Sequence, residues 1–195
     1  MIRWLLWIAG GLVLGGVVHL VTIMWLPRTA TQDAYARLTP VAPVNGFKLL
    51  PAPTPADSTM PFMDPAFATA VCRYDLTKGP VKLSVPVSQA YTSVTFYTRY
   101  DVAYYAVNDR SASRRAIELD LMTTKQHDDL PEDEEVTSAD RLIIDSPSTT
   151  GLIVLKALAP EPGLMPQAQA TLAASSCRVQ TDQPAKQAEA PRGKR

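Results

Sequence analysis

An unbroken apolar segment, WLLWIAGGLVLGGVVHLVTIMWL, occupies residues 4–26 and constrains this chain more than any other feature of its sequence. The segment contains no acidic or basic side chain except that of His19. With a rise of about 1.5 Å per residue, a helix of this length covers about 34 Å, which is enough to cross a bilayer. Trp4, Trp7 and Trp25 lie near its ends, where indole rings prefer the level of the lipid headgroups. The segment therefore predicts a transmembrane helix over residues 4–26.

Two interpretations of this helix remain open, a retained anchor and a cleaved secretion signal. A signal has a shorter apolar core, of about 7 to 15 residues, followed by a small-x-small cleavage site. Here the run is longer and ends at Leu26 without such a site, so we expect an anchor. The flanking charges, Arg3 before it and Arg28, Arg37 and Asp33 after it, do not decide the orientation. A first helix with so short a leader is expected to leave the N-terminus in the cytoplasm and the bulk outside.

Small residues inside the apolar segment could bring two helices together. Gly11 and Gly15 form a G-x-x-x-G pattern, in which the missing side chains allow two helix backbones to approach closely. The pattern is also common in the spans of monomeric anchors, so both interpretations stay open.

The rest of the chain divides into three parts by composition. Residues 28–65 form a lead-in whose second half is rich in proline, with seven prolines between positions 40 and 65, too many for a regular helix or a central strand. Residues 66–178 are rich in aromatic and β-branched runs separated by turn residues. Residues 179–195 are polar, lack large apolar side chains and are expected to be a disordered tail.

The middle part predicts a mainly antiparallel β domain, sandwich-like, with one or two short helices. The run RAIELDLM alternates apolar and acidic residues with the period of two that marks a half-buried strand. Thr123 and Gln126 have the spacing of a capping box and predict a short helix that Pro131 stops. A last helix is expected over LMPQAQATLAASSC, with Cys177 at its end.

The chain has two cysteines, Cys72 and Cys177, near the start and the end of the β-rich part. In an exported domain an even pair indicates a disulfide, whereas in the cytosol two buried thiols are the usual state. No C-x-x-C is present, and nothing in the pattern predicts a metal or redox centre.

An aromatic and arginine cluster is the candidate ligand or partner surface, represented by Tyr97, Arg99 and Tyr104. Aromatic faces beside guanidinium groups can bind sugars, peptides or carboxylates, and they are common anchors of protein interfaces. The alternative is that these side chains pack within the sheet, because strand alternation prevents the whole cluster from sharing one face.

No sequence motif predicts catalysis, and we expect neither catalytic residues nor a metal or cofactor. The acidic run HDDLPEDEEVTSAD contains Pro131 and no glycine, so it is expected to be a solvated loop and not a calcium site, with a hydrolase as the least favoured function. The basic and acidic side chains balance at 19 each, which gives no electrostatic basis for nucleic-acid binding.

Three stretches resemble the bacterial proteins of the domain of unknown function (DUF) 1254 family, in its short single-anchor form. They are PFMDPAFATAVCRYDL, then GPVKLSVPVSQAYTSVTFYTRYDVAYYAVNDR, then SPSTTGLIVLKALAPEPG with the late Cys177, and the likeness runs from about Ala30 to Cys177. The resemblance implies an inner-membrane protein with a periplasmic β-rich domain and a companion anchored protein of the domain of unknown function (DUF) 1214 family, to which it is fused in longer relatives. The family brings no established activity. The expected function is thus a non-enzymatic assembly or envelope module, with the binding of a small periplasmic ligand, a glycan or a peptide, as the alternative.

Overall fold

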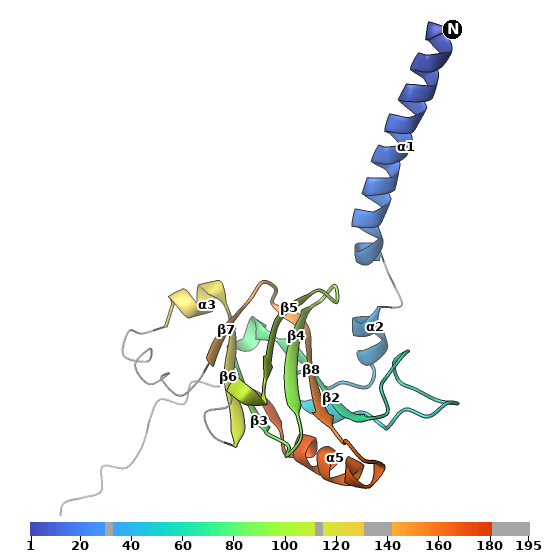
Figure 1. Ribbon diagram of the computed structural model, residues 1–195. Helices are drawn as coiled ribbons and strands as arrows, with labels where there is room; N and C mark the ends of the chain where they lie inside the picture. The colour runs from blue at the N-terminus through green and yellow to red at the C-terminus, as the bar shows by residue number, and fades with distance from the viewer. Residues whose placement is uncertain (30–32, 112–114, 131–141, 181–195) are drawn as a thin grey trace, which may run out of the picture.

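The computed structural model describes residues 1–29, 33–111, 115–130 and 142–180 (Figure 1). Its first element, α1 (Ile2–Thr29), projects away from the body of the protein, in which two β-sheets contain all the named strands. Over Ile2–Leu26 this helix is long and apolar enough to cross a membrane, a property that anchors and secretion signals share.

The first sheet has five strands in the order β1-β2-β8-β4-β5, all antiparallel to their neighbours. Its long central strands β2 and β8 pair over nine residues, from Phe67 opposite Leu158 to Asp75 opposite Thr150. The bounds are β1 (Phe47–Leu49), β2 (Phe67–Asp75), β8 (Thr150–Leu158), β4 (Thr92–Thr98) and β5 (Ala103–Asn108).

The second sheet has four strands in the order β7-β6-β3-β9. Its bounds are β7 (Leu142–Ser146), β6 (Ala116–Thr123), β3 (Val81–Pro86) and β9 (Ser176–Val179). Only the β6–β7 pair is parallel among the described strand pairs, and α3 lies in the connection between these two strands. The expected alternation along β6 is confirmed, since Ile117, Leu119 and Leu121 are buried while the residues between them are half-buried.

The two sheets pack face to face over one apolar core, which confirms the predicted sandwich-like fold. Alternate residues of facing strands fill this core, because strand side chains point to opposite faces in turn. Its largest fully buried side chains include Tyr74, Phe96, Leu83, Leu119 and Leu155.

Short helices complete the described chain: α2 (Ala34–Leu38), α3 (Thr124–Asp128), α5 (Met165–Ala173) and the 3₁₀ turns Leu76–Lys78, Asp109–Ser111 and Pro162–Leu164. The capping box predicted at Thr123 and Gln126 is present at the start of α3. α5 packs against β2 and β8 through Ala168 and Leu172.

One sequence expectation was wrong: Cys177 does not end the last helix. α5 stops at Ala173, and Cys177 lies on β9, where it pairs with Leu83 of β3. The Ala-rich local sequence favours a helix, but residues 176–179 form a strand because pairing with the edge of β3 buries Cys177 in the core. Val179, which the sequence assigned to the tail, is the last residue of β9, and residues 181–195 lie outside the described part of the chain.

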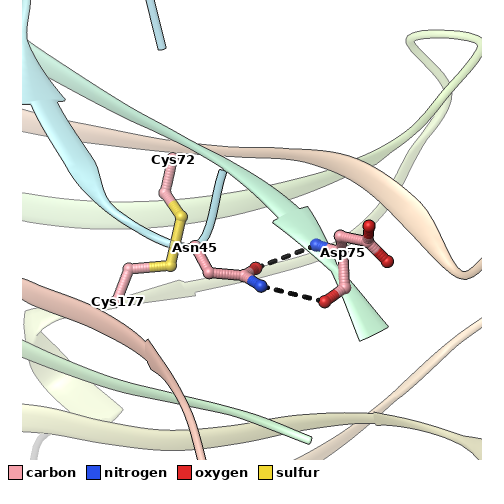
Figure 2. The surroundings of a disulfide bond; sticks show 4 residues. All are labelled: Asn45, Cys72, Asp75 and Cys177. Carbon is pink, nitrogen blue, oxygen red and sulfur yellow. Dashed lines mark hydrogen bonds between the residues drawn. A yellow bond between two sulfur atoms is a disulfide. The ribbon is translucent and has the colours of Figure 1, made fainter. Parts of the chain in front are cut away.

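The two cysteines form the expected disulfide, whose Cα atoms are 6.8 Å apart (Figure 2). Cys72 lies on β2 of the five-stranded sheet and Cys177 on β9 of the four-stranded sheet, so the bond joins the two layers. Beside it, the Asn45 side chain accepts a hydrogen bond from the Asp75 N–H at 2.9 Å and donates one to the Asp75 carbonyl at 3.0 Å. The lead-in is therefore fixed to the end of β2.

Candidate binding groove

The outer face of the five-stranded sheet, away from the sandwich core, carries a second apolar cluster. It consists of Leu38 from α2, Ala42 and Leu50 from the lead-in, Val71 from β2 and Leu152 from β8. The proline-rich lead-in thus crosses this face and buries part of it. Its prolines prevent regular strand pairing, so the lead-in adds only the short edge strand β1 to the sheet. The rest of it covers the sheet face with side chains.

A groove remains open where this cover is incomplete. It is a cavity of about 250 Å³ between the sheet, α2 and the lead-in segment 50–64. The floor is formed by Val71 of β2, Tyr97 of β4, and Leu152 and Val154 of β8, while Met60 and Met63 form the wall on the lead-in side.

Three features at the rim of the groove distinguish it from a packing defect. Phe62 is 103% exposed and adopts a left-handed φ of 58°, a conformation that bulky residues rarely hold. Lys156 lies at the end of the floor with its Nζ 5.9 Å from the centre of the Phe67 ring. Asp101 lies at the opposite end, beside Ala34 of α2.

A polar clamp holds α2 onto the sheet next to this groove. Arg99 Nη1 lies 3.1 Å from Asp33 Oδ2, and the Arg99 guanidinium lies over the Tyr35 ring at 4.3 Å from its centre. Asp33 also caps α2, because its Oδ1 accepts a hydrogen bond from the Ala36 N–H at 2.7 Å. The clamp therefore links the turn after β4 to the first turn of α2.

Asp101 completes the clamp from the β4–β5 turn. Its Oδ2 accepts a hydrogen bond from the Ala34 N–H at 2.8 Å, and its own backbone is left-handed, with φ of 59°. Burial raises the pKa of the Asp101 carboxyl above its usual 3.8, and the neighbouring Asp33 carboxylate acts in the same direction, while the hydrogen bond from Ala34 and the Arg99 charge oppose the shift.

A separate hydroxyl cluster lies inside the sandwich. The Tyr74 hydroxyl lies 3.0 Å from Ser146 Oγ and 3.2 Å from Ser148 Oγ, and it accepts a hydrogen bond from the Tyr104 hydroxyl at 3.2 Å. Burial raises the pKa of the Tyr104 phenol. Gly151 makes room for this arrangement, since a Cβ there would meet the Tyr97 carbonyl and the Tyr74 hydroxyl. The cluster satisfies buried polar groups and joins β2, β5 and β7.

The structure separates the three residues of the predicted ligand or partner surface. Tyr97 lies on the floor of the groove, and Arg99 lies in the α2 clamp on the same sheet face. Tyr104 lies at a bulge in the β4–β5 pairing and points to the opposite side, where it packs against the core. Gly11 and Gly15 lie on α1 with no atom within 4 Å of an added Cβ.

Sequence reasoning missed the residues that make the groove. The groove is lined by segments that are far apart in the chain: α2, the rest of the lead-in, β2, β4 and β8. No local sequence pattern therefore predicts it. The one usable signal was STMPFMD, in which three large apolar side chains stand in a segment that its prolines keep out of regular structure.

Other candidate chemistry is sparse in the described ranges. His127 Nδ1 lies 2.9 Å from Asp145 Oδ1 at a partly exposed surface, and no group of three or more metal-ligating side chains occurs among the described residues. The acidic run lies largely in residues 131–141, outside the described part of the chain.

Together, the two sheets, the disulfide between them and the apolar N-terminal helix define the class: a β-sandwich domain suited to an oxidising compartment, preceded by a candidate membrane span. Residues 44–179 match the model of the family described as "Protein of unknown function (DUF1254)". The chain belongs to this family, as its sequence resemblance indicated.

Comparison with solved structures finds the same fold in a longer protein. The VPA0106 protein of Vibrio parahaemolyticus superposes with a TM-score of 0.57 and 14% identity, over 83% of this chain and 38% of that chain. A Burkholderia cenocepacia protein described as uncharacterized gives a TM-score of 0.48 and 13% identity, over 73% of this chain and 36% of its own. A search of curated proteins gave no match. The first likeness shows a shared fold, and this chain spans less than two fifths of the length of either protein.

Proposed function

We propose that the protein is a single-pass protein of the bacterial inner membrane whose periplasmic sandwich is a non-enzymatic assembly module of the envelope. The observation that carries this proposal is the α2 clamp. It fixes the sheet to a helix that begins five residues after the end of α1, so the sandwich is held close to the membrane.

Two features taken together support the proposed compartment. α1 has the length and apolarity of a span, and the Cys72–Cys177 disulfide requires an oxidising environment. With α1 retained, the N-terminus lies in the cytoplasm and the sandwich in the periplasm. The tryptophans near both ends of the span support a helix that stays in the bilayer.

The clamp also presents an apolar surface beside the anchor. In the β4–β5 turn, Tyr100 is 49% exposed and Val102 is 58% exposed, and Asp101 between them is hydrogen-bonded to α2. β5 is an edge strand of its sheet, with Tyr105 partly exposed on it. Exposed apolar side chains beside an open strand edge favour docking of a second chain.

The partner that we propose is a second exported protein with its own anchor, the companion of the domain of unknown function (DUF) 1214 family. The fold occupies only 38% of the Vibrio chain, so in that protein the sandwich is joined to much additional chain. Modules fused in longer relatives are expected to touch when separate genes encode them. Gly11 and Gly15 leave one side of α1 free for the partner's helix.

The experiment places a photoreactive benzoylphenylalanine at Tyr100 or Val102 of the full-length protein in intact cells. The matched control positions are Gln167 and Glu161, exposed residues on or beside α5 at the other end of the sandwich. We expect Tyr100 and Val102 to crosslink to one membrane-anchored exported protein, and Gly11→Leu to reduce the yield. Equal yields at all four positions, or products scattered over unrelated proteins, would contradict the assembly function.

A small-ligand function has one observation in its favour, the groove over β2 and β8. It is compatible with assembly because Tyr100 and Val102, the proposed docking residues, lie outside the groove, which the β4–β5 turn meets only at Asp101.

A further inference from the structure

The groove on the outer sheet face is built for a flexible hydrocarbon chain. The branched side chains of Val71, Leu152 and Val154 form its floor with the Tyr97 ring, and Met60 and Met63 form a wall of unbranched, adaptable side chains. A volume of about 250 Å³ lies just below the range of about 300 to 1,000 Å³ typical of sites for whole small ligands. The groove therefore suits one chain and not the two chains of a phospholipid.

The groove has a cation, Lys156, at one end, and its lining also includes the carboxylates of Asp64 and Asp101. Along β8 its floor runs from Leu152 to Lys156, four residues that cover about 13 Å. Lys156 is exposed and forms no ion pair with any residue that the structure describes. An exposed ammonium group at the end of an apolar groove complements a chain that ends in an anionic group, because the head group can stay hydrated while the chain is buried.

The position of the groove, close in the chain to α1, indicates that such a ligand would come from the membrane. Ala34 lines the groove and follows Thr29, the last residue of α1, by five residues. Five residues span at most about 18 Å, so the groove cannot lie far from the membrane that holds α1. Phe62, fully exposed on the rim, adds an apolar contact for a chain that leaves the lipid.

We propose that this groove binds a fatty acid from the adjacent membrane, with the hydrocarbon chain over Val71, Leu152 and Val154 and the carboxylate at Lys156. This inference rests on the retention of α1 as an anchor, as proposed above. It assigns a ligand to the groove, which meets the β4–β5 turn proposed to dock the partner only at Asp101.

The test uses the full-length protein in phosphatidylcholine nanodiscs with dodecanoic acid, a chain about as long as the groove floor, that carries a diazirine near its methyl end. After illumination, labelled peptides are mapped by mass spectrometry. We expect label on residues 60–71 and 150–158 of the groove in addition to label on α1, which any lipid-dissolved probe reaches. The label on α1 shows whether this helix lies in the lipid, whatever the outcome at the groove.

Two variants, each with a control, test separately the binding of the hydrocarbon chain and the binding of the carboxylate. Val154→Trp fills the groove and should abolish the groove label, whereas Gln167→Trp, which adds the same bulk on α5, should not. Lys156→Glu should reduce the groove label by up to about five-fold, which is the loss of affinity expected when one exposed ion pair is removed. Lys125→Glu on α3 should leave the label unchanged. Lys156 is exposed, so its variant tests the proposal even where Val154→Trp fails to fold.

Several outcomes would overturn the inference. Label on α1 without label in the groove would reject the fatty-acid site while leaving the anchor in place. No label on α1 would instead contradict the proposed anchoring. Equal groove labelling by diazirine-bearing dodecanol, which lacks the carboxylate, or by a diazirine-bearing diacyl phosphatidylcholine would reject a fatty acid as the ligand.

Discussion

Arg99 shows why a residue's chemistry can be predicted more easily than its partner. Its position in an aromatic stretch favoured a binding surface, and Arg99 lies just after the end of β4, where it pairs with Asp33. The groups it contacts, Asp33 and the Tyr35 ring, are more than 60 residues away in the sequence. Nothing local in the sequence predicts such a pair, because the lead-in is brought to the strand only by the tertiary fold.

Gly151 is a residue at which the fold leaves no room for a side chain. Gly151→Ala should destabilise the sandwich by about 1–3 kcal/mol, because the new Cβ would meet the Tyr97 carbonyl and the Tyr74 hydroxyl. Chemical unfolding of the purified protein measures the change. Gly163→Ala is the control, with no atom within 4 Å of its added Cβ, and equal stability of the two variants would contradict this account.

Asp101 gives the clamp a pH dependence whose sign is fixed by burial. Its raised pKa means that the folded protein keeps the proton to higher pH than the unfolded chain, so the stabilisation is complete below about 3.8 and is lost as the pH rises through the folded pKa. Asp101→Asn cannot ionise. The melting temperature of this variant minus that of the wild type should therefore increase as the pH rises from below 3.8. A difference that decreases over this range would show that the carboxylate is net favourable.

At the scale of elements, the sequence predicted what short-range periodicity encodes. The alternation of β6 and the capping box of α3 are local patterns, and both are present. β9 was missed because its four residues follow an Ala-rich helical stretch and gain their strand conformation from pairing with β3. The groove could not be predicted either, because it exists only where α2, the rest of the lead-in, β2, β4 and β8 meet.

The α2 clamp makes a prediction about one element. Arg99→Ala removes the ion pair with Asp33 and the contact with Tyr35, so α2 should detach more often while the sheets remain intact. Hydrogen–deuterium exchange should become faster for the amides of residues 34–38 and stay unchanged in β2 and β8. Arg110→Ala, at an exposed arginine of the 3₁₀ turn after β5, is the matched control. Unchanged exchange in α2 would mean that its apolar contacts hold it alone.

At the scale of the molecule, the predicted sandwich was found because strand density and turn spacing determine the class, while the strand order depends on long-range pairing. The disulfide closes a loop with a sequence separation of 105 and joins the two sheets. For a loop of about 100 residues, the chain-entropy model gives a stabilisation of up to about 4.7 kcal/mol.

Cys177→Ala tests this link between the sheets. We expect it to lower the free energy of unfolding by about 2–4 kcal/mol and to abolish the mobility difference between reduced and non-reduced gels. Cys72→Ala should give the same loss, and the double variant should add little. Losses that sum in the double variant would show that the cysteines act separately.

The central claim is that an exported sandwich is held at the membrane by a helix that is never removed. The most direct test is the intact mass of the protein extracted from membranes with its thiols blocked and without reduction. The account predicts the full sequence from Met1 or the next residue, lower by the pair of hydrogens lost when Cys72 and Cys177 join. A mass that lacks residues 1–26, or one that carries a blocking group on each cysteine, would contradict it.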